Sequence, residues 1–544
     1  MRLHSHYHLS DCRFVILLVM TAAVYHLIVG LQGFDMYDEG WSLTGFQQIF
    51  EAPESVEYLF LYYLTNIVGG LWNIIFGFGG IYAFRILAGI VLTLTAVVVW
   101  LMLRQYFNRW CIFIGIMASF TCCYYGMMVF YHNYLTALLS TCAAYTLWKS
   151  LVNDNSKWIF VSGILIGCNI FVRIPNIVLT SFVLLLIPYY IYKRNLWQTF
   201  KLLGVFICGF FAGVAAVALL MLTLGHLDIF LSAVNSGFSA TSDQESTHHL
   251  SSMAVTYLGV YRTILTQGIF NNTYTIYLAG TLACLWSVTA RRHESGQVYL
   301  ACISLILMHL LPLGSDFGIQ NMGENCIYLA APFTIGIIFK ELQSLRVSHS
   351  IRRSFVAVGI LFLVLFIVRG GKNIMQQCYF DEGSRKDKLF MPEAELATTF
   401  TTEQNCKELN AIMRVLDNYV NPGDTLLCFQ NMPTIHYLTR TRPYLQNPWV
   451  WSYDPSNMER KFEEAERRSP TLPVIVREKS MITYWTEYYP DWDNDHATNT
   501  YLHKNKKITL IHHFIQKHHY QVVWENDICQ ILIAQTARGN RAAH

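Results

Sequence analysis

The sequence predicts an α-helical, polytopic membrane protein with about eleven transmembrane helices, followed by an extracytoplasmic α/β domain. Of the 544 residues, 53% are hydrophobic and only 14% are charged, and the mean hydropathy is +0.32, which is too apolar for a chain that must hydrate its whole surface. Long apolar runs fill residues 1–370, and residues 371–544 contain none. The first part also holds only 19 of the 39 Lys and Arg residues, so the composition changes near residue 370.

Eleven apolar runs are long enough to cross a bilayer, whose hydrocarbon core of about 30 Å requires roughly 20 helical residues. We place them near residues 14–31, 81–103, 111–131, 134–150, 158–173, 176–192, 202–225, 274–290, 297–314, 325–340 and 354–370. The first run follows a basic start, but it is too long for the apolar part of a signal peptide and lacks a clear cleavage site. We therefore expect it to remain as an anchor.

A twelfth apolar stretch, residues 58–78, carries Asn66, Asn73 and several glycines, and the positive charges decide its place. If this stretch does not cross and the amino terminus is cytoplasmic, 15 of the 19 Lys and Arg residues fall on the cytoplasmic side. A further crossing would reverse every later loop and violate the positive-inside rule. The stretch is therefore predicted to lie along the outer surface, as a re-entrant or interfacial helix.

This topology places the tail and three substantial loops outside the membrane. The loops span residues 32–80, 225–272 and 314–325, and they hold most of the acidic residues of the first part. The second loop has the pattern of two amphipathic helices joined by a Ser- and Thr-rich turn. The expected location is the cell inner membrane, with the amino terminus cytoplasmic and the tail extracytoplasmic.

Residues 371–544 alternate helical and strand patterns and predict a small α/β domain. A helix is expected at residues 405–420, strands at 425–429 and 472–478, and a closing hairpin at 520–535. The domain has no Gly-rich phosphate loop, no GxSxG and no metal-ligand spacing, so it is predicted to stabilise the site or to cover the substrate. Its four cysteines would be able to pair in an oxidising compartment, although their spacing is not diagnostic.

An acidic cluster, DMYDE at residues 35–39, follows the first predicted span. Carboxylates at a membrane edge are costly unless they are solvated, paired or functional. From the residues alone, two interpretations stay open: a wet loop, or a site on the outer face.

The cluster belongs to a longer pattern that resembles a known family. An acidic loop ending in Asp-Glu-Gly (DMYDEGWSLTGFQ) is followed by an apolar segment, a Gly-rich turn and an Arg that opens the next span (FGFGGIYAFRILAGIVLTL). This order resembles the GT-C superfamily of membrane glycosyltransferases, and most of all its branch of protein O-mannosyltransferases and lipid A aminoarabinose transferases. Members of that branch often carry His-Pro-Pro-Leu-Tyr where this chain reads EAPESVEYLFLYYL, so the sugar and the acceptor stay open.

The resemblance implies an inverting glycosyltransferase that moves a hexosyl or pentosyl group from a polyprenyl phosphate donor to a lipid, glycan or protein acceptor. Asp38 matches the catalytic carboxylate of the first outer loop and would act as base, with Glu39 beside it to orient the acceptor or hold a cation. No cofactor is required by this chemistry, although a divalent cation is left open, with Asp35 as its candidate ligand.

The leaving phosphate would call for a guanidinium on the outer side. Arg173 is the preferred ligand because Pro175 breaks the helix beside it, and Arg262 and Arg85 follow, although each arginine would also suit the lipid headgroups. Further candidates, each with a structural alternative, are His132 with Asn133, Asp316 with Glu324, and the weak metal pair His248 and His249.

Two other functions compete with this interpretation. A transporter, flippase or polysaccharide polymerase would also be polytopic, but a transporter should show repeated halves with ionisable groups at mid-membrane, and the sequence shows no internal repeat. A non-catalytic membrane subunit would make the acidic cluster dispensable. Nucleic acid is not an expected partner, because the net charge is only +3 and no basic stripe is present.

Overall fold

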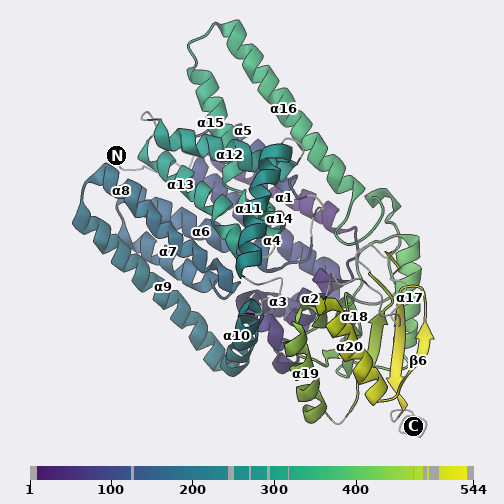
Figure 1. The fold of residues 1–544 in the computed structure, drawn as a ribbon. Helices are drawn as coiled ribbons and strands as arrows, with labels where there is room; N and C mark the ends of the chain where they lie inside the picture. Colours follow the sequence, from purple (N-terminus) through teal and green to yellow (C-terminus); the bar gives the residue numbers. More distant parts are fainter. Residues whose placement is uncertain are drawn as a thin grey trace.

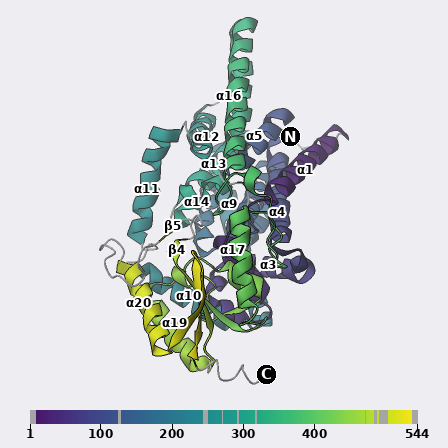
Figure 2. The same cartoon turned by 90° about the vertical axis from the view of Figure 1, so that its right-hand side faces the viewer.

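The computed structural model consists of a helical body and a sheet-containing domain that lies against one end of it (Figures 1 and 2). The structure describes residues 9–123, 126, 128–242, 250–268, 271–290, 294–315, 318–469, 471–481, 487–488 and 502–535. The predicted fold class, an apolar helical part followed by an α/β domain, is confirmed at this level.

Long helices form the body, and each predicted span overlaps at least one of them. They are α1 (Leu9–Gly30), α4 (Gly80–Leu103), α5 (Arg109–Phe120), α6 (His132–Asn153), α7 (Ser156–Asn169), η3 with α8 (Ile174–Leu185 and Leu186–Lys193), α9 (Leu196–Leu224), α12 (Asn272–Thr289), α13 (Ser295–His309), α14 with α15 (Ile319–Cys326 and Ala330–Ser344) and α16 (His349–Gln376). The prediction for 111–131 was too long, because α5 ends at Phe120.

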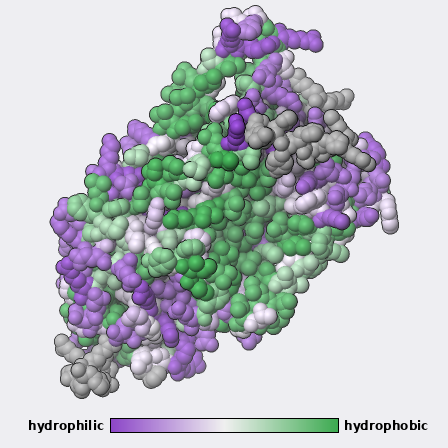
Figure 3. All heavy atoms as spheres, turned by 180° about the vertical axis from the view of Figure 1, so that it is seen from behind, coloured by the Kyte–Doolittle hydropathy of each residue, from purple (hydrophilic) through white to green (hydrophobic). Residues whose placement is uncertain are grey.

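Length and hydropathy alone qualify fewer helices as spans. Among the described residues, six helices are long and apolar enough to cross a membrane, or seven if α14 and α15, which meet at a bend of 59°, form one span. Large apolar side chains are exposed along α9 and α16, such as Phe211 at 62% and Val358 at 64%. Figure 3 shows apolar residues in a broad band across the middle of the molecule, with hydrophilic residues gathered beside it. Such a band is what lipid tails would cover.

The doubtful stretch folds into consecutive helical segments that lead directly into α4, with a left-handed φ of 59° at Gly80. It comprises η1 (Pro53–Tyr62), α3 (Tyr63–Phe76) and η2 (Gly77–Gly79). One side of α3 packs on α2 (Asp38–Gln48), where the close approach of the Phe46 ring leaves no room for a side chain at Gly69. On the other side Ile74 and Ile75 are more than 60% exposed. Helix α3 thus has one side packed on the protein and one exposed apolar side, which is compatible with the predicted position at the membrane surface.

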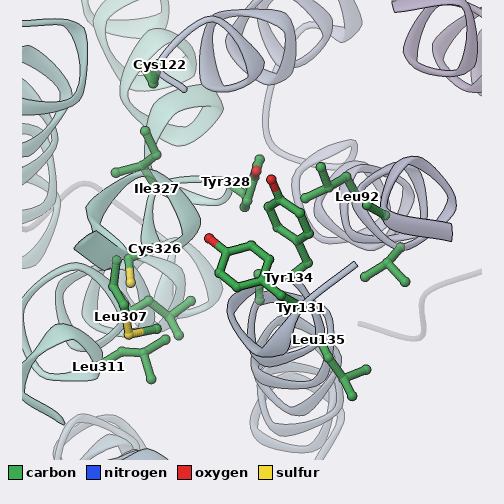
Figure 4. Close-up of a cluster of buried hydrophobic side chains, with 14 of the residues drawn as sticks. Leu92, Cys122, Tyr131, Tyr134, Leu135, Leu307, Leu311, Cys326, Ile327 and Tyr328 are labelled. Carbon is green, nitrogen blue, oxygen red and sulfur yellow. The ribbon is translucent and has the colours of Figure 1, made fainter. Parts of the chain in front are cut away.

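The second of the three predicted outer loops contains the two predicted helices, α10 (Leu227–Ser242) and α11 (Leu250–Gln267). The core of the body gathers aromatic and aliphatic side chains from α4, α6, α13 and the α14–α15 bend, with Tyr131, Tyr134 and Tyr328 among them (Figure 4).

The tail contains a five-stranded sheet in the order β2-β1-β3-β7-β6. Its strands are β1 (Thr425–Phe429), β2 (Arg442–Pro443), β3 (Val474–Glu478), β6 (Tyr520–Glu525) and β7 (Cys529–Ala534), and a small hairpin of β4 (Ser480–Met481) and β5 (Glu487–Tyr488) follows β3. The first three strands are parallel, and β7 and β6 add to them antiparallel. The predicted strands and closing hairpin are confirmed.

Helices cover both faces of this sheet. Because side chains alternate along a strand, Leu426 and Cys428 pack with α17 (Glu403–Leu416), while Leu427 and Phe429 pack with α19 (Pro455–Arg468) and α20 (Leu502–Lys517). The four cysteines of the tail, all within the described residues, form no disulfide.

The tail begins with a connecting segment, residues 377–401, that runs back along the first outer loop. The amide of Gly33 donates to the carbonyl of Phe400 at 2.8 Å, and the amide of Phe34 donates to the buried carboxylate of Asp381 at 2.7 Å. Lys388 neutralises Asp381 at 3.4 Å, and both side chains are fully buried. These contacts fix the tail to the acidic loop.

Candidate active site

The acidic cluster folds into the start of helix α2. The carboxylate of Asp35 is fully buried and accepts the backbone amides of Tyr37 at 2.7 Å and Glu39 at 2.8 Å. These amides lie where a helix leaves its first N–H groups without intrahelical partners, so Asp35 caps α2. Burial, together with the nearby carboxylates of Asp38 and Glu39, raises the pKa of Asp35 well above its usual range.

Asp35 was also the candidate metal ligand. Both of its oxygens already accept a backbone amide, and no group of three His, Cys, Asp or Glu side chains in the described part of the chain is arranged to hold a metal ion. The geometry therefore gives Asp35 the role of a helix cap.

Glu39 forms a buried, two-pronged ion pair with Arg85 of α4. Nε and Nη2 of Arg85 donate to the Glu39 carboxylate at 3.0 and 2.7 Å, and Glu39 also accepts the amide of Val129 at 2.8 Å. The other N–H groups of Arg85 point at the carbonyls of Gly30, Gln32 and Gly33. All five donors of the guanidinium are thus used. This differs from the expected roles, because Arg85 has no N–H left for a phosphate and Glu39 has its charge neutralised.

Asp38 differs from its two acidic neighbours because its side chain is only half-buried. It accepts a hydrogen bond from the hydroxyl of Tyr379, which belongs to the connecting segment. Burial and the carboxylate of Asp38 raise the pKa of the Tyr379 phenol, so this hydroxyl stays protonated and donates at neutral pH. The hydrogen bond from Tyr379 therefore holds the carboxylate of Asp38 in place, and part of this side chain stays accessible to solvent.

Half-buried aromatic residues flank Asp38 in sequence, and their rings pack on rings of η1 and of the tail. The ring of Tyr37 lies 5.1 Å from that of Phe380 and 4.8 Å from that of Trp449. Trp41 is one helical turn after Asp38 on α2, and its ring lies 5.1 Å from Tyr62. The body and the tail therefore both contribute rings to the surroundings of Asp38.

His132 lies against two of these rings, and Arg173 lies near His132. His132 begins α6, and its ring is 4.4 Å from Tyr62 and 6.4 Å from Trp41. Arg173 is buried, its charge acts on His132, and its guanidinium contacts the sulfur of Met322. The predicted break occurs: α7 ends at Asn169, and η3 begins at Ile174 with a proline in its first turn. The structure thus brings Asp38, His132 and Arg173 to one region.

Glu324 is half-buried on α14, and its charge acts on Tyr131, whose ring lies 5.2 Å from that of His132. Arg262 is exposed on α11. Asp316, His248 and His249 lie outside the described residues.

The tail packs closely on α2 at Gly40. The amide of Thr434, in α18 (Thr434–Thr439), donates to the carbonyl of Met36 at 3.2 Å, and its hydroxyl donates to the carbonyl of Asp35 at 2.9 Å. A Cβ at Gly40 would overlap the backbone of Thr434. The glycine of the Asp-Glu-Gly pattern therefore makes room for the tail.

Reasoning from the sequence missed Tyr379, Trp41 and Trp449. Tyr379 is 341 residues from Asp38, and no local pattern links the two. Trp41 had a signal, because an aromatic residue three positions after Asp38 shares its face if the segment is helical.

No family model and no curated protein matches the chain. Among solved structures, the chain is similar to the crystal structure of ArnT from Cupriavidus metallidurans bound to undecaprenyl phosphate. The two share 11% sequence identity, and the alignment covers 95% of this chain and 97% of ArnT with a TM-score of 0.45.

Proposed function

We propose that this chain is a membrane glycosyltransferase that moves a sugar from a polyprenyl phosphate donor to an acceptor hydroxyl on the extracytoplasmic side of the membrane. The observation that carries the proposal is that the three carboxylates of the acidic cluster differ in burial and in their bonds. Asp35 and Glu39 are buried and bonded within the fold, whereas Asp38 is half-exposed beside a tyrosine hydroxyl and flanked in sequence by aromatic residues.

The reaction is a single displacement. The carboxylate of Asp38 takes the proton of the acceptor hydroxyl while the oxygen attacks the anomeric carbon of the donor. The bond from that carbon to the phosphate oxygen breaks, and its electron pair leaves with the polyprenyl phosphate. One displacement on the face opposite the leaving group inverts the anomeric configuration.

Arg173 is the proposed partner of the leaving phosphate. It is buried, its charge acts on His132, whose ring lies 6.4 Å from that of Trp41, and its cation would stabilise the negative charge that develops on the phosphate. Its contact with Met322 would be exchanged for the phosphate when the donor binds. Arg85 is not proposed for this role, because its donors hold Glu39 and the first outer loop.

The experiment is a transfer assay in membranes that contain or lack the chain, with a radiolabelled pool of polyprenyl phosphate sugars. The proposal expects label in an acceptor, release of one polyprenyl phosphate for each sugar transferred, and an anomeric configuration, determined by NMR, opposite to that of the donor. Labelled lipid that changes leaflet without losing its sugar would identify a flippase and overturn the proposal. Retention of configuration would overturn the single displacement.

A further inference from the structure

The tail sheet has a topological switch point beside the acidic loop. From β1 the chain moves to β2 on one side and later to β3 on the other, and all three strands are parallel. In open parallel sheets, ligands bind outside the carboxyl ends of the strands at such a reversal. Figure 2 shows the β4 and β5 hairpin, which follows β3, between the sheet and the helical body. The carboxyl ends of the parallel strands therefore face the body.

Hydrogen bonds organise the polar residues at this edge. Glu478, the last residue of β3, is fully buried and accepts the amide of Asn431 at 2.9 Å. The side-chain oxygen of Asn431 accepts the indole N–H of Trp449 at 3.2 Å. Gln430, between β1 and Asn431, is buried and has a φ of 77°, which is a strained conformation for a residue other than glycine. Such strain persists where the surrounding structure enforces it and is concentrated at functional sites.

The carboxyl edge of the sheet is linked to the acidic loop that contains the proposed base, Asp38. The oxygen of the Asn447 side chain accepts both the backbone amide of Trp449 at 3.1 Å and the indole N–H of Trp41 at 3.2 Å. One amide of the tail therefore orients a tryptophan on each side of the junction. Both rings are half-buried, and that of Trp449 contacts Tyr37, the residue before Asp38.

The cations near this edge are directed away from it. Arg477 donates to Gln530 of β7, and Lys479 donates to the carbonyl of Asn526 at 2.9 Å. Among the described residues, the edge thus offers two oriented indole rings and amide side chains beside the buried carboxylate of Glu478. Indole faces carry negative charge and attract the C–H groups of a sugar ring, while amides both donate to and accept from hydroxyls.

We propose that the carboxyl edge of β1 and β3, with Asn431, Trp449 and Trp41, is the acceptor subsite of this enzyme and that it binds a carbohydrate ring. This inference rests on the proposed function and makes the tail the domain that selects the acceptor. A sugar stacked on Trp449 would present a hydroxyl toward Asp38.

The test uses the purified full-length chain in detergent with the Asp38→Asn substitution, so that binding is measured without turnover. The probes are an array of defined mono- to tetrasaccharides and an array of peptides of similar mass. We expect saturable binding to a subset of the saccharides. Trp449→Leu and Asn431→Ala should weaken it by about tenfold or more, because a buried aromatic anchor carries much of the affinity at such a site.

Trp524→Leu is the matched control, because Trp524 lies on β6 at the far side of the sheet, and it should leave binding unchanged. Equal melting temperatures would show that the variants are folded. The inference is overturned if no saccharide binds, if only peptides bind, or if Trp449→Leu binds as the parent does. Saccharide binding by a chain that transfers no sugar would refute the proposed function and leave this subsite standing.

Discussion

The hydroxyl of Tyr379 donates a hydrogen bond to the carboxylate of Asp38, and this bond joins the connecting segment of the tail to the first outer loop of the body. The same segment is held to that loop by Asp381 and Phe400. The tail is therefore part of the proposed site, and its docking determines how Asp38 is presented.

Replacing Tyr379 with Phe should shift the acidic side of the pH profile of kcat/KM to higher pH. The phenol stabilises the ionised form of Asp38, and the proposed base must be ionised to accept a proton. A hydrogen bond to a charged group contributes roughly 1.5–3 kcal/mol, and about 1.4 kcal/mol corresponds to one pH unit, so a shift of about one to two units is expected. Activity should recover as the pH rises above the new midpoint.

The measurement is initial transfer rate against pH at low acceptor concentration. Tyr192→Phe is its control, because that side chain is 48% exposed on α8. A Tyr379→Phe enzyme with an unchanged acidic side would show that this hydrogen bond does not act on the base.

Glu39→Gln should destabilise the folded protein by about 3–5 kcal/mol, because it leaves the buried guanidinium of Arg85 without its counter-charge. The melting temperature of the purified protein in detergent measures the effect. Glu403→Gln removes an exposed ion pair with Lys407 and should change the melting temperature little. Equal melting temperatures for Glu39→Gln and the parent would mean that the ion pair does not hold the loop.

Gly40→Ala should loosen the tail from α2, since the added methyl group would overlap the backbone of Thr434. Overpacking of this kind costs about 1–3 kcal/mol. Limited proteolysis of the tail reports the loosening, and Thr434→Ala should not rescue it, because backbone atoms make the overlap. Gly259→Ala is the matched control, as no atom lies within 4 Å of the added Cβ. Unchanged protease resistance in Gly40→Ala would contradict the packing described here.

Much of the fold could be predicted from the sequence because its signals are local. An apolar run such as that of α9 needs no partner to be recognised, and β1, β3 and the closing hairpin are bounded by turn residues and follow strand patterns. Helix α2 was missed because its start depends on a buried cap, Asp35, which the tail contacts through Thr434, 399 residues away.

The site could be predicted only in part for the same reason. The acidic cluster and Arg173 were visible as charges beside predicted spans. The different roles of Asp38 and Glu39 were not visible in the sequence. Glu39 is neutralised by Arg85, which is 46 residues away, and Asp38 is bonded by Tyr379, which is 341 residues away. Charge and order along the chain identify candidates, and only tertiary contacts show which of them are already neutralised.

The most direct test of the central claim is sugar transfer by the Asp38→Asn protein, measured with a radiolabelled polyprenyl phosphate sugar pool in membranes that contain equal amounts of inserted protein. Loss of a positioned general base predicts a fall of about 10²–10⁴-fold in transfer. Asp228→Asn removes an exposed carboxylate of α10 and should keep the parental rate. Transfer by Asp38→Asn at the parental rate would contradict the assignment of Asp38 as the base.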